Sequence, residues 1–320
     1  MRCKSIQYFS SATFFRIIFN GIAVICLFSN SCSSQNKADF FTPSPTINNS
    51  RLVPLLVGEA AFYTTSMVGL NVLWYKDYPH SSFHLFNDNK EWQQMDKLGH
   101  MLTAYTISRF AAALYQWSGI KQQPAAVYGT SLGMAFQTNI EVFDGFSSAW
   151  GFSLGDMAAN TAGASLFLSQ EAGWGEQRIG LKISFHPTEY RQYRPEELGD
   201  NNLQADLKDY NGQTYWVSIA IASFLPKGYK IPGWACIDFG YGAEGMIGAI
   251  TNPPVYNVNG EELDFERYRK YFLSLDVDLT KIPTNSSALK AVFGAVSFIK
   301  IPMPTLEYSR KKFKFHILYF

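Results

Sequence analysis

The sequence contains few cysteines, and none of them stands in a pattern that binds zinc. Four occur among 320 residues, with no Cys-x-x-Cys pair and no cysteine–histidine cluster, so we expect no metal site and no cofactor. Cys3 and Cys26 lie in an N-terminal segment that we expect to be removed. If Cys32 then carries a lipid, Cys236 is alone and cannot form an intramolecular disulfide, whereas a free Cys32 leaves a bridge to Cys236 open.

A charge excess of either sign is also missing. Lys and Arg number 27 against 26 Asp and Glu, and no stripe of basic residues occurs, so nucleic acid is not an expected partner. The chain also lacks the His-Glu-x-x-His and P-loop patterns of metalloproteases and nucleotide-binding proteins. Aromatic residues, by contrast, make up 16% of the chain, and such residues concentrate at membrane interfaces and in sheets.

The N-terminus has the features of an export signal. Residues 1–16 are basic and carry no acidic side chain. The apolar run 17–28 is too short to span a bilayer comfortably, and Ser-Asn-Ser-Cys follows it at 29–32. This pattern predicts a secretory signal peptide at residues 1–31.

The cleavage site leaves two alternatives open. Small residues directly before Cys32 favour lipid attachment at that cysteine, which is our first interpretation. Ser29 stands where such signals usually carry Leu, so the alternative is plain cleavage near Ser31 or Ser33. In both cases residues 32–50 are expected to form a polar, flexible tether.

Four apolar segments rich in Ala, Gly, Leu and Met follow the tether. They predict helices at 52–75, 97–118, 124–143 and 153–170. Ser153 with Asp156 three residues later is a capping pattern for the last of them. The first segment is nearly long enough to span a membrane, but Pro54 and Glu59 weaken that interpretation. We therefore expect a helical domain over residues 51–177, built as a bundle of about four helices.

Apolar and polar residues alternate in the second half of the chain with the period of β-strands. The clearest case is 271–279, where Leu273 and Leu275 share one face and Ser274 and Asp276 share the other. Such a strand is typical of a sheet with one face in water. We expect the polar face of this strand to be the wet one.

Further strands are expected along the rest of this half. They are predicted at 178–186, 215–225, 234–243, 289–301 and 305–320. Asn211-Gly212 predicts a hairpin turn between two of them. The fold class is therefore α+β, with an antiparallel sheet or a partial or complete β-barrel over residues 178–320. The abundance of aromatic residues favours membrane contact by this part.

Ionisable residues interrupt the apolar helical segments. The set is Asp96, Lys97, His100, Glu141, Asp144, Asp156 and Asn160. Three pairs among them are three or four residues apart, so the members of each pair share one face of a helix. The pairs are Asp96 with His100, Glu141 with Asp144, and Asp156 with Asn160. We expect the three helices to converge on one polar cluster.

This cluster has two interpretations. Carboxylates and imidazoles on facing helices build metal sites and supply general acids and bases, and the catalytic candidates are His100, Asp96, Glu141, Asp144 and Asp156. The favoured interpretation is a structural network, because ion-pair networks produce the same clusters. In that case Asp156 caps a helix, and Lys97 pairs with Asp144 or Glu141.

Several motifs resemble one known family. "MDKLGH", "IEVFDGFS" and "GDMAANTAG" are similar to the YfiM-like predicted periplasmic lipoproteins, a family known as domain of unknown function 2279. The resemblance covers about residues 51–180. "SFHLFNDNKEWQQMDK" and "KDYNGQTYW" resemble the longer members, which carry a β-rich C-terminal part. The resemblance implies a location in the bacterial envelope and a helical core, and it implies no reaction.

These observations favour an exported envelope protein that is held at the outer membrane or its periplasmic face. We expect a non-enzymatic structural or binding component whose partner is membrane lipid. The alternative is a membrane-proximal hydrolase that acts on a lipid or phosphate ester through His100 and the nearby carboxylates. A catalytic site needs an open pocket, whereas a structural network should be closed and have every polar group paired.

Overall fold

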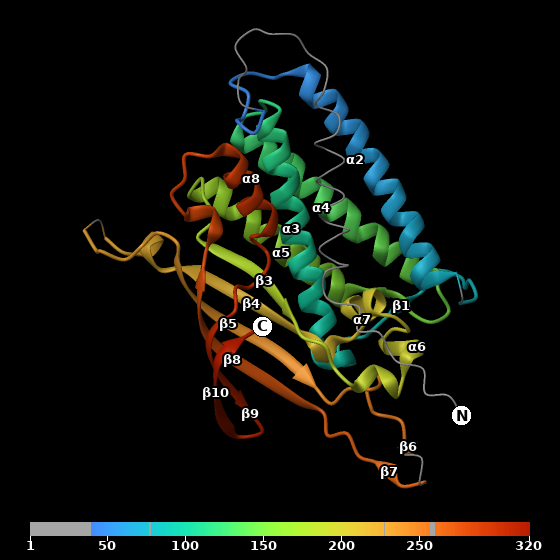
Figure 1. Cartoon of the computed structure of the whole chain (residues 1–320). Coiled ribbons are helices and arrows are strands. Elements are labelled where there is room, and N and C mark those ends of the chain that lie inside the picture. Colours follow the sequence, from blue (N-terminus) through green and yellow to red (C-terminus); the bar gives the residue numbers. More distant parts are fainter. Residues whose placement is uncertain (1–39, 77, 227, 257–259) are drawn as a thin grey trace, which may run out of the picture.

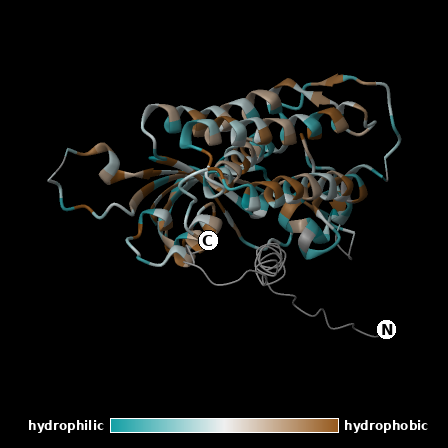
Figure 2. Ribbon diagram, turned by 90° about the horizontal axis from the view of Figure 1, so that it is seen from above, coloured by the Kyte–Doolittle hydropathy of each residue, from teal (hydrophilic) through white to brown (hydrophobic). Residues whose placement is uncertain are grey.

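A computed structural model describes residues 40–76, 78–226, 228–256 and 260–320 (Figure 1). The expected signal peptide and Cys32 lie outside the described residues, as does most of the expected tether. Within the described part the fold is α+β: long helices pack beside one twisted antiparallel sheet. Figure 2 gives the same arrangement from above and shows that hydrophobic and hydrophilic residues mix along both the helices and the strands.

All four apolar segments are helical, but a bundle of four is not confirmed. The helices are α2 (Asn49–Leu70, continued by a π-helical turn Asn71–Tyr75), α3 (Met95–Trp117), α4 (Gln122–Gly145) and α5 (Leu154–Gly173). Helices α3, α4 and α5 pack closely because glycines face neighbouring backbone: a Cβ on Gly163 would lie 2.0 Å from Met101 O. Along α2, by contrast, Met67 is the one buried residue.

The main sheet has six strands in the described part of the chain. In spatial order they are β10 (Lys312–Tyr319), β9 (Met303–Ser309), β8 (Tyr268–Val277), β5 (Ala235–Glu244), β4 (Gln213–Ala220) and β3 (Ile179–Phe185). Residues 298–300 bridge to the outer edge of β3 at Ile183. All neighbours are antiparallel, and within the described residues β3 and β10 do not pair with each other. The prediction of a complete barrel is therefore wrong.

Two short two-stranded pairs and three short helices complete the fold. The pairs are β1 (Leu85–Phe86) with β2 (Phe152–Ser153), which is parallel, and β6 (Val255–Tyr256) with β7 (Glu262–Leu263). The helices are α6 (Pro195–Leu198), α7 (Asn202–Lys208) and α8 (Ser287–Val296). Segment 289–301, expected as a strand, is thus mostly helical, with Ser286 as its N-cap.

Two turns also differ from expectation. Asn211-Gly212 is no hairpin, because it lies in a 3-10 turn that leads into β4 after the excursion through α6 and α7. The Asn211 side chain is buried there and bonds both the N–H and the C=O of Met246. The expected strand 305–320 is instead a hairpin, with Arg310 and Lys311 at positive φ in its turn.

The sheet and the helices share one hydrophobic core. Tyr105 of α3 and Phe167 of α5 pack on Leu181 and Ile183 of β3 and on Tyr215 of β4. The helices therefore cover one face of the sheet at β3, β4 and the end of β5, where Ala243 belongs to the same core. Toward β8, β9 and β10 this face does not contribute to that core.

The polarity of the sheet is the reverse of what the alternation led us to expect. In β8, Ser274 and Asp276 are 3% and 2% exposed, whereas Leu275 is 54% exposed. Asp276 is buried because Lys182 of β3 and Lys300 lie beside it, with Nζ to carboxylate distances of 2.5 and 3.6 Å. The prediction of a wet polar face is thus wrong, and the apolar face is the open one.

Candidate functional site

The polar cluster is assembled by a local pairing that joins distant segments. Strand β1 pairs in parallel with β2, so the loop after β1 lies beside the start of α5. Ser153 caps α5, since its hydroxyl accepts from the Asp156 N–H, as its spacing predicted. The same hydroxyl donates to Asp88 Oδ1 at 2.6 Å. Asp88 is thereby fixed at the edge of the cluster.

Lys97 holds the carboxylates of two different segments. Its Nζ lies 2.7 Å from Asp88 Oδ2 and 2.7 Å from Asp156 Oδ1, and Asp96 Oδ2 is 3.4 Å away. The expected pairing of Lys97 with Asp144 or Glu141 is therefore not what the structure shows. The ammonium ties the first turn of α3 to the first turn of α5 and to the β1 loop.

His100 faces polar groups with both ring nitrogens. Its Nδ1 lies 3.2 Å from Asn160 Oδ1 and 3.5 Å from Glu141 Oε1. Its Nε2 points toward Asp96 Oδ1 at 3.8 Å. Gln137 Nε2 is 3.1 Å from Nδ1 and donates to Asn160 Oδ1 at 2.9 Å. Residues of α3, α4 and α5 thus meet around one imidazole.

Asp144 stands beside this group rather than within it. Its Oδ1 accepts from the Tyr75 hydroxyl at 2.9 Å, which links α4 to the turn after α2. Asp96 in turn accepts from the Tyr210 hydroxyl at 2.6 Å. The cluster is therefore closed by tyrosines from two other parts of the chain.

Burial makes several of these carboxyl groups hard to ionise. Burial raises the pKa of Glu141 to about 8, and the nearby Asp156 adds to this while His100 opposes it. Burial, reinforced by Asp96, raises the pKa of Asp144 to about 7 and that of Asp156 to about 8. For Asp88 burial acts in the same direction, but hydrogen bonds from Asp156 and Lys97 outweigh it and lower its pKa.

Some buried polar atoms of the cluster lack a partner. Among the described residues, Glu141 Oε1, Asn160 Nδ2 and Gln137 Oε1 make no hydrogen bond. Such atoms are uncommon in protein interiors. The network is closed to a large extent, with the His100 side chain 13% exposed, but it is not fully satisfied.

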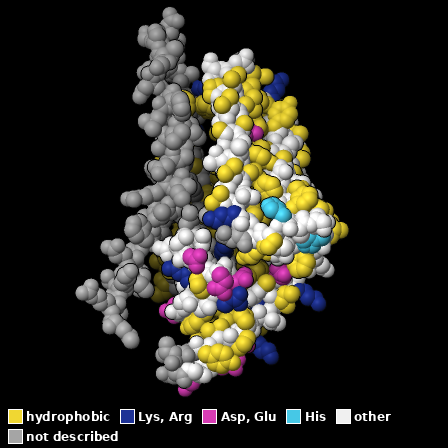
Figure 3. Space-filling view, turned by 90° about the vertical axis from the view of Figure 1, so that its right-hand side faces the viewer, with side chains coloured by type: hydrophobic (Ala, Val, Ile, Leu, Met, Phe, Trp, Pro, Cys, Tyr) yellow, Lys and Arg dark blue, Asp and Glu magenta, His cyan; other side chains and the backbone are white. Residues whose placement is uncertain are grey.

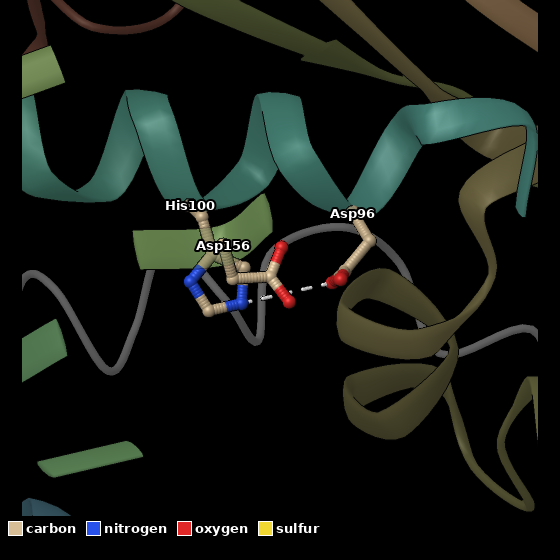
Figure 4. A group of neighbouring side chains, drawn as sticks. All are labelled: Asp96, His100 and Asp156. Atoms are coloured by element: carbon tan, nitrogen blue, oxygen red, sulfur yellow. Dashed lines mark ion pairs between the residues drawn. The ribbon is translucent and has the colours of Figure 1, made fainter. Parts of the chain in front are cut away.

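A metal could be held at one corner of the cluster. Figure 4 shows Asp96 and His100 projecting from the same side of α3 toward Asp156. One ligand atom from each lies within 4.8 Å of the others, and this donor set suits a divalent cation. The Lys97 ammonium already lies 2.7 Å from Asp156 Oδ1. It therefore supplies the positive charge that a bound cation would bring to these acidic side chains.

Four contributors are not marked by any motif in the sequence: Tyr75, Asp88, Gln137 and Tyr210. Asp88 lies in "NDNKE", which has oxygen-rich side chains but no further pattern. Gln137 carries no charge in an apolar helix, and Tyr210 comes from the other half of the chain. The sequence contains no periodic signal that would link these residues to α3.

Two short glycine motifs lack the structure that would make them functional. Gly-Thr-Ser-Leu-Gly at 129–133 matches the pattern around hydrolase serines, but it lies inside α4, and the Ser131 hydroxyl donates to Val127 O. Gly-Tyr-Gly-Ala-Glu-Gly at 240–245 matches a dinucleotide-binding pattern. It ends β5 without opening a helix, and Gly240 packs on Trp216. Neither motif supports catalysis or cofactor binding.

Comparison with known protein families gives a match. A family model described as predicted periplasmic lipoprotein (DUF2279) matches residues 84–169. This segment contains β1, α3, α4 and most of α5, and so all seven ionisable or amide residues that the sequence singled out. Comparisons with curated proteins and with solved structures find no match. The similarity supports an exported protein of the cell envelope, on the periplasmic side. The function of the matched family is unknown.

Proposed function

We propose that the protein is a non-enzymatic component of the bacterial envelope that binds membrane lipid through α2. The outer membrane is its proposed location, and membership of the long form of the YfiM-like family is part of this proposal. The observation that carries it is the polarity of α2, which is the reverse of that of a surface helix in a water-soluble protein. Its polar side chains face the rest of the protein, and its apolar side chains face outward.

The inner side of α2 is occupied by polar contacts. Glu59, which argued against a membrane helix, accepts from the Tyr115 hydroxyl at 2.7 and 2.9 Å. Tyr63 bonds Asn139 of α4, and Leu55 packs against the cluster around Tyr115. No charged side chain of α2 between Leu52 and Leu70 therefore faces outward.

The outer side of α2 is apolar and uncovered by the described residues. Its exposed side chains include Val53, Leu56, Val57, Phe62 and Val68. In Figure 3 the upper part of this side of the molecule carries mostly hydrophobic and uncharged side chains, and most charged side chains gather below it. The helix is long and apolar enough to cross a membrane: 22 residues at about 1.5 Å each give roughly 33 Å, against a hydrocarbon core of about 30 Å.

The polar cluster supports a structural role. Lys97 is held by two carboxylates, and both nitrogens of His100 face carboxylate or amide side chains rather than a hydroxyl or thiol. A hydrolase acting through His100 stays the alternative, but no contact of this imidazole favours it.

Vesicle flotation tests the proposal. The Cys32→Ser substitution removes any lipid anchor. We expect the protein that carries it to float with phospholipid vesicles and to stay bound to them during carbonate washing. Val57→Asp with Phe62→Asp should release it, whereas Ile231→Asp, in an exposed loop before β5, should not. A Cys32→Ser protein that is monomeric without detergent and never floats would overturn the proposal.

A further inference from the structure

We propose that the open face of the sheet beyond β4 is a second membrane-contacting surface, which lies against the hydrocarbon of one lipid leaflet. We call it the outer sheet face, and it comprises Phe239, Tyr271, Leu273, Leu275, Leu306, Tyr308, Phe313, Phe315 and Ile317, all of them exposed. The inference rests on the membrane association proposed above, but it concerns a different surface.

Strand register arranges these side chains in continuous rows. One row runs through Val217, Phe239, Leu273, Leu306 and Phe315, which are direct partners across five neighbouring strands. A second row, two residues away along each strand, runs through Tyr241, Tyr271, Tyr308 and Phe313. A third contains Ile237 and Leu275. The outer sheet face is therefore one continuous apolar patch. It differs from the single, scattered apolar residues that are normal on the surfaces of soluble proteins.

The opposite face of the same strands buries charge. Lys182, Lys300 and Asp276 form its ion pairs. Glu307 lies 2.7 Å from His316, and Lys270 lies 3.1 Å from Glu244. Burying charged groups is costly unless each one is paired. In a sheet whose outer face is exposed to water, such charged side chains would point outward into the solvent. The polarity of these strands is instead that of strands whose apolar side chains face lipid.

The edge of the patch matches the chemistry of a membrane surface. The tyrosine row lies at the end of the strands nearest the β9–β10 turn. The turn carries Arg310, Lys311 and Lys312 in succession. Tyrosines prefer the headgroup level of a bilayer, and basic side chains are attracted to anionic headgroups. This complementarity of charge selects a lipid surface as the occupant.

The height of the outer sheet face indicates how deeply it enters the lipid bilayer. From the tyrosine row to the Ile237–Leu275 row is four residues along β5, which is roughly 13 Å at about 3.3 Å per residue. One leaflet contributes about half of a hydrocarbon core of about 30 Å. The patch therefore fits one leaflet and does not span the bilayer.

Depth-dependent quenching tests this inference. A Cys32→Ser/Cys236→Ser protein receives a single cysteine with an environment-sensitive fluorophore, and it is mixed with phosphatidylcholine–phosphatidylglycerol vesicles that contain acyl-brominated lipids. Labels at Leu273→Cys and Phe315→Cys should be quenched several-fold more than a label at Lys311→Cys in the turn. A label at Glu189→Cys, an exposed position in the loop that follows β3, should not be quenched.

Two controls separate the possible failures. If Val57→Cys on α2 is quenched and Leu273→Cys is not, α2 binds the membrane and the sheet inference is overturned. If neither is quenched, the proposed function fails as well. If Leu273→Cys is shielded from aqueous iodide without lipid, in a protein that sediments as a dimer, the outer sheet face binds a second copy and the inference is again overturned.

The basic turn gives an independent readout. Lys311→Glu with Lys312→Glu should lower binding to the anionic vesicles by about tenfold and leave binding to pure phosphatidylcholine vesicles unchanged. An equal loss on both vesicle types would show that the turn does not recognise anionic headgroups, and it would remove the charge argument for lipid.

Discussion

The ammonium group of Lys97 lies 2.7 Å from Asp156 Oδ1, and this contact joins the first turns of α3 and α5. Both side chains are largely buried, at 13% and 5% exposure. Lys97 also holds Asp88 of the β1 loop. The start of the helical core is therefore held by one cation shared between two acidic side chains.

Removing that cation should destabilise the protein strongly. We expect Lys97→Met to leave the Asp88 carboxylate buried without a counter-charge and Asp156 without its partner, at a cost of about 3–5 kcal/mol for a broken buried pair. Differential scanning calorimetry should show a marked fall in Tm. Lys290→Met, on the exposed surface of α8, should melt like the wild type. If both variants have the same Tm, the cluster does not have the structural role proposed for it.

Stability should fall as pH rises through the neutral range. The pKa values of Glu141, Asp144 and Asp156 are raised to about 8, 7 and 8 in the fold, above ordinary values near 4. Between about pH 4 and pH 8 the folded protein thus holds more protons than the unfolded chain, so its stability is greatest at the acidic end and is lost toward pH 8. Tm measured from pH 5 to pH 9 checks this.

The neutral variant Glu141→Gln assigns the effect to the cluster. It should flatten the decrease of Tm with pH, while Glu176→Gln, on an exposed side chain, should leave the slope unchanged. A Tm that is constant or rises between pH 5 and pH 8 contradicts the prediction.

The reversed polarity of the sheet changes the expected effect of substitutions in β8. Ser274→Asp should reduce the folded yield, because it places a carboxylate where the Ser274 hydroxyl now bonds Thr305 at 2.8 Å, close to buried Asp276. Leu275→Asp should fold, because this side chain is exposed, but it should bind vesicles less well. Alternation alone suggested the opposite order. If Leu275→Asp fails to fold and Ser274→Asp does not, the register is wrong.

Anchoring at Cys32 stays a prediction, since this residue lies outside the described part of the chain. Cells expressing the wild-type protein should yield a mature form whose intact mass includes acyl chains. Cys32→Ser should remove that mass increment or block processing. A mature wild-type protein of unmodified mass would establish plain cleavage of the signal instead.

Local signals in the sequence were sufficient for most secondary structure. The capping serine at 153, the apolar helical segments and the period-two alternation each depend on neighbours within a few residues. They failed at two places. Segment 289–301 alternates poorly and became α8, and Asn211-Gly212 became a buried turn because Asn211 bonds Met246.

The candidate site was predictable only within each helix. Spacing placed His100 on the same helix face as Asp96, and Asn160 on the same face as Asp156. It could not supply the partners that come from other segments, such as Asp88 and Tyr210. Nor could the spacing show which acidic residues pair with Lys97, because that pairing depends on how β1 pairs with β2.

The sequence by itself determined the α+β division, the helix faces that carry polar pairs and the alternation of the strands. Only the tertiary structure decided which side of each element is covered. Alternation defines two faces but not which of them meets water, because a Lys182–Asp276 pair can be buried once both partners converge from strands far apart in the chain. That convergence turned the charged face of the sheet inward and left Leu273, Leu275 and Phe315 on the outside.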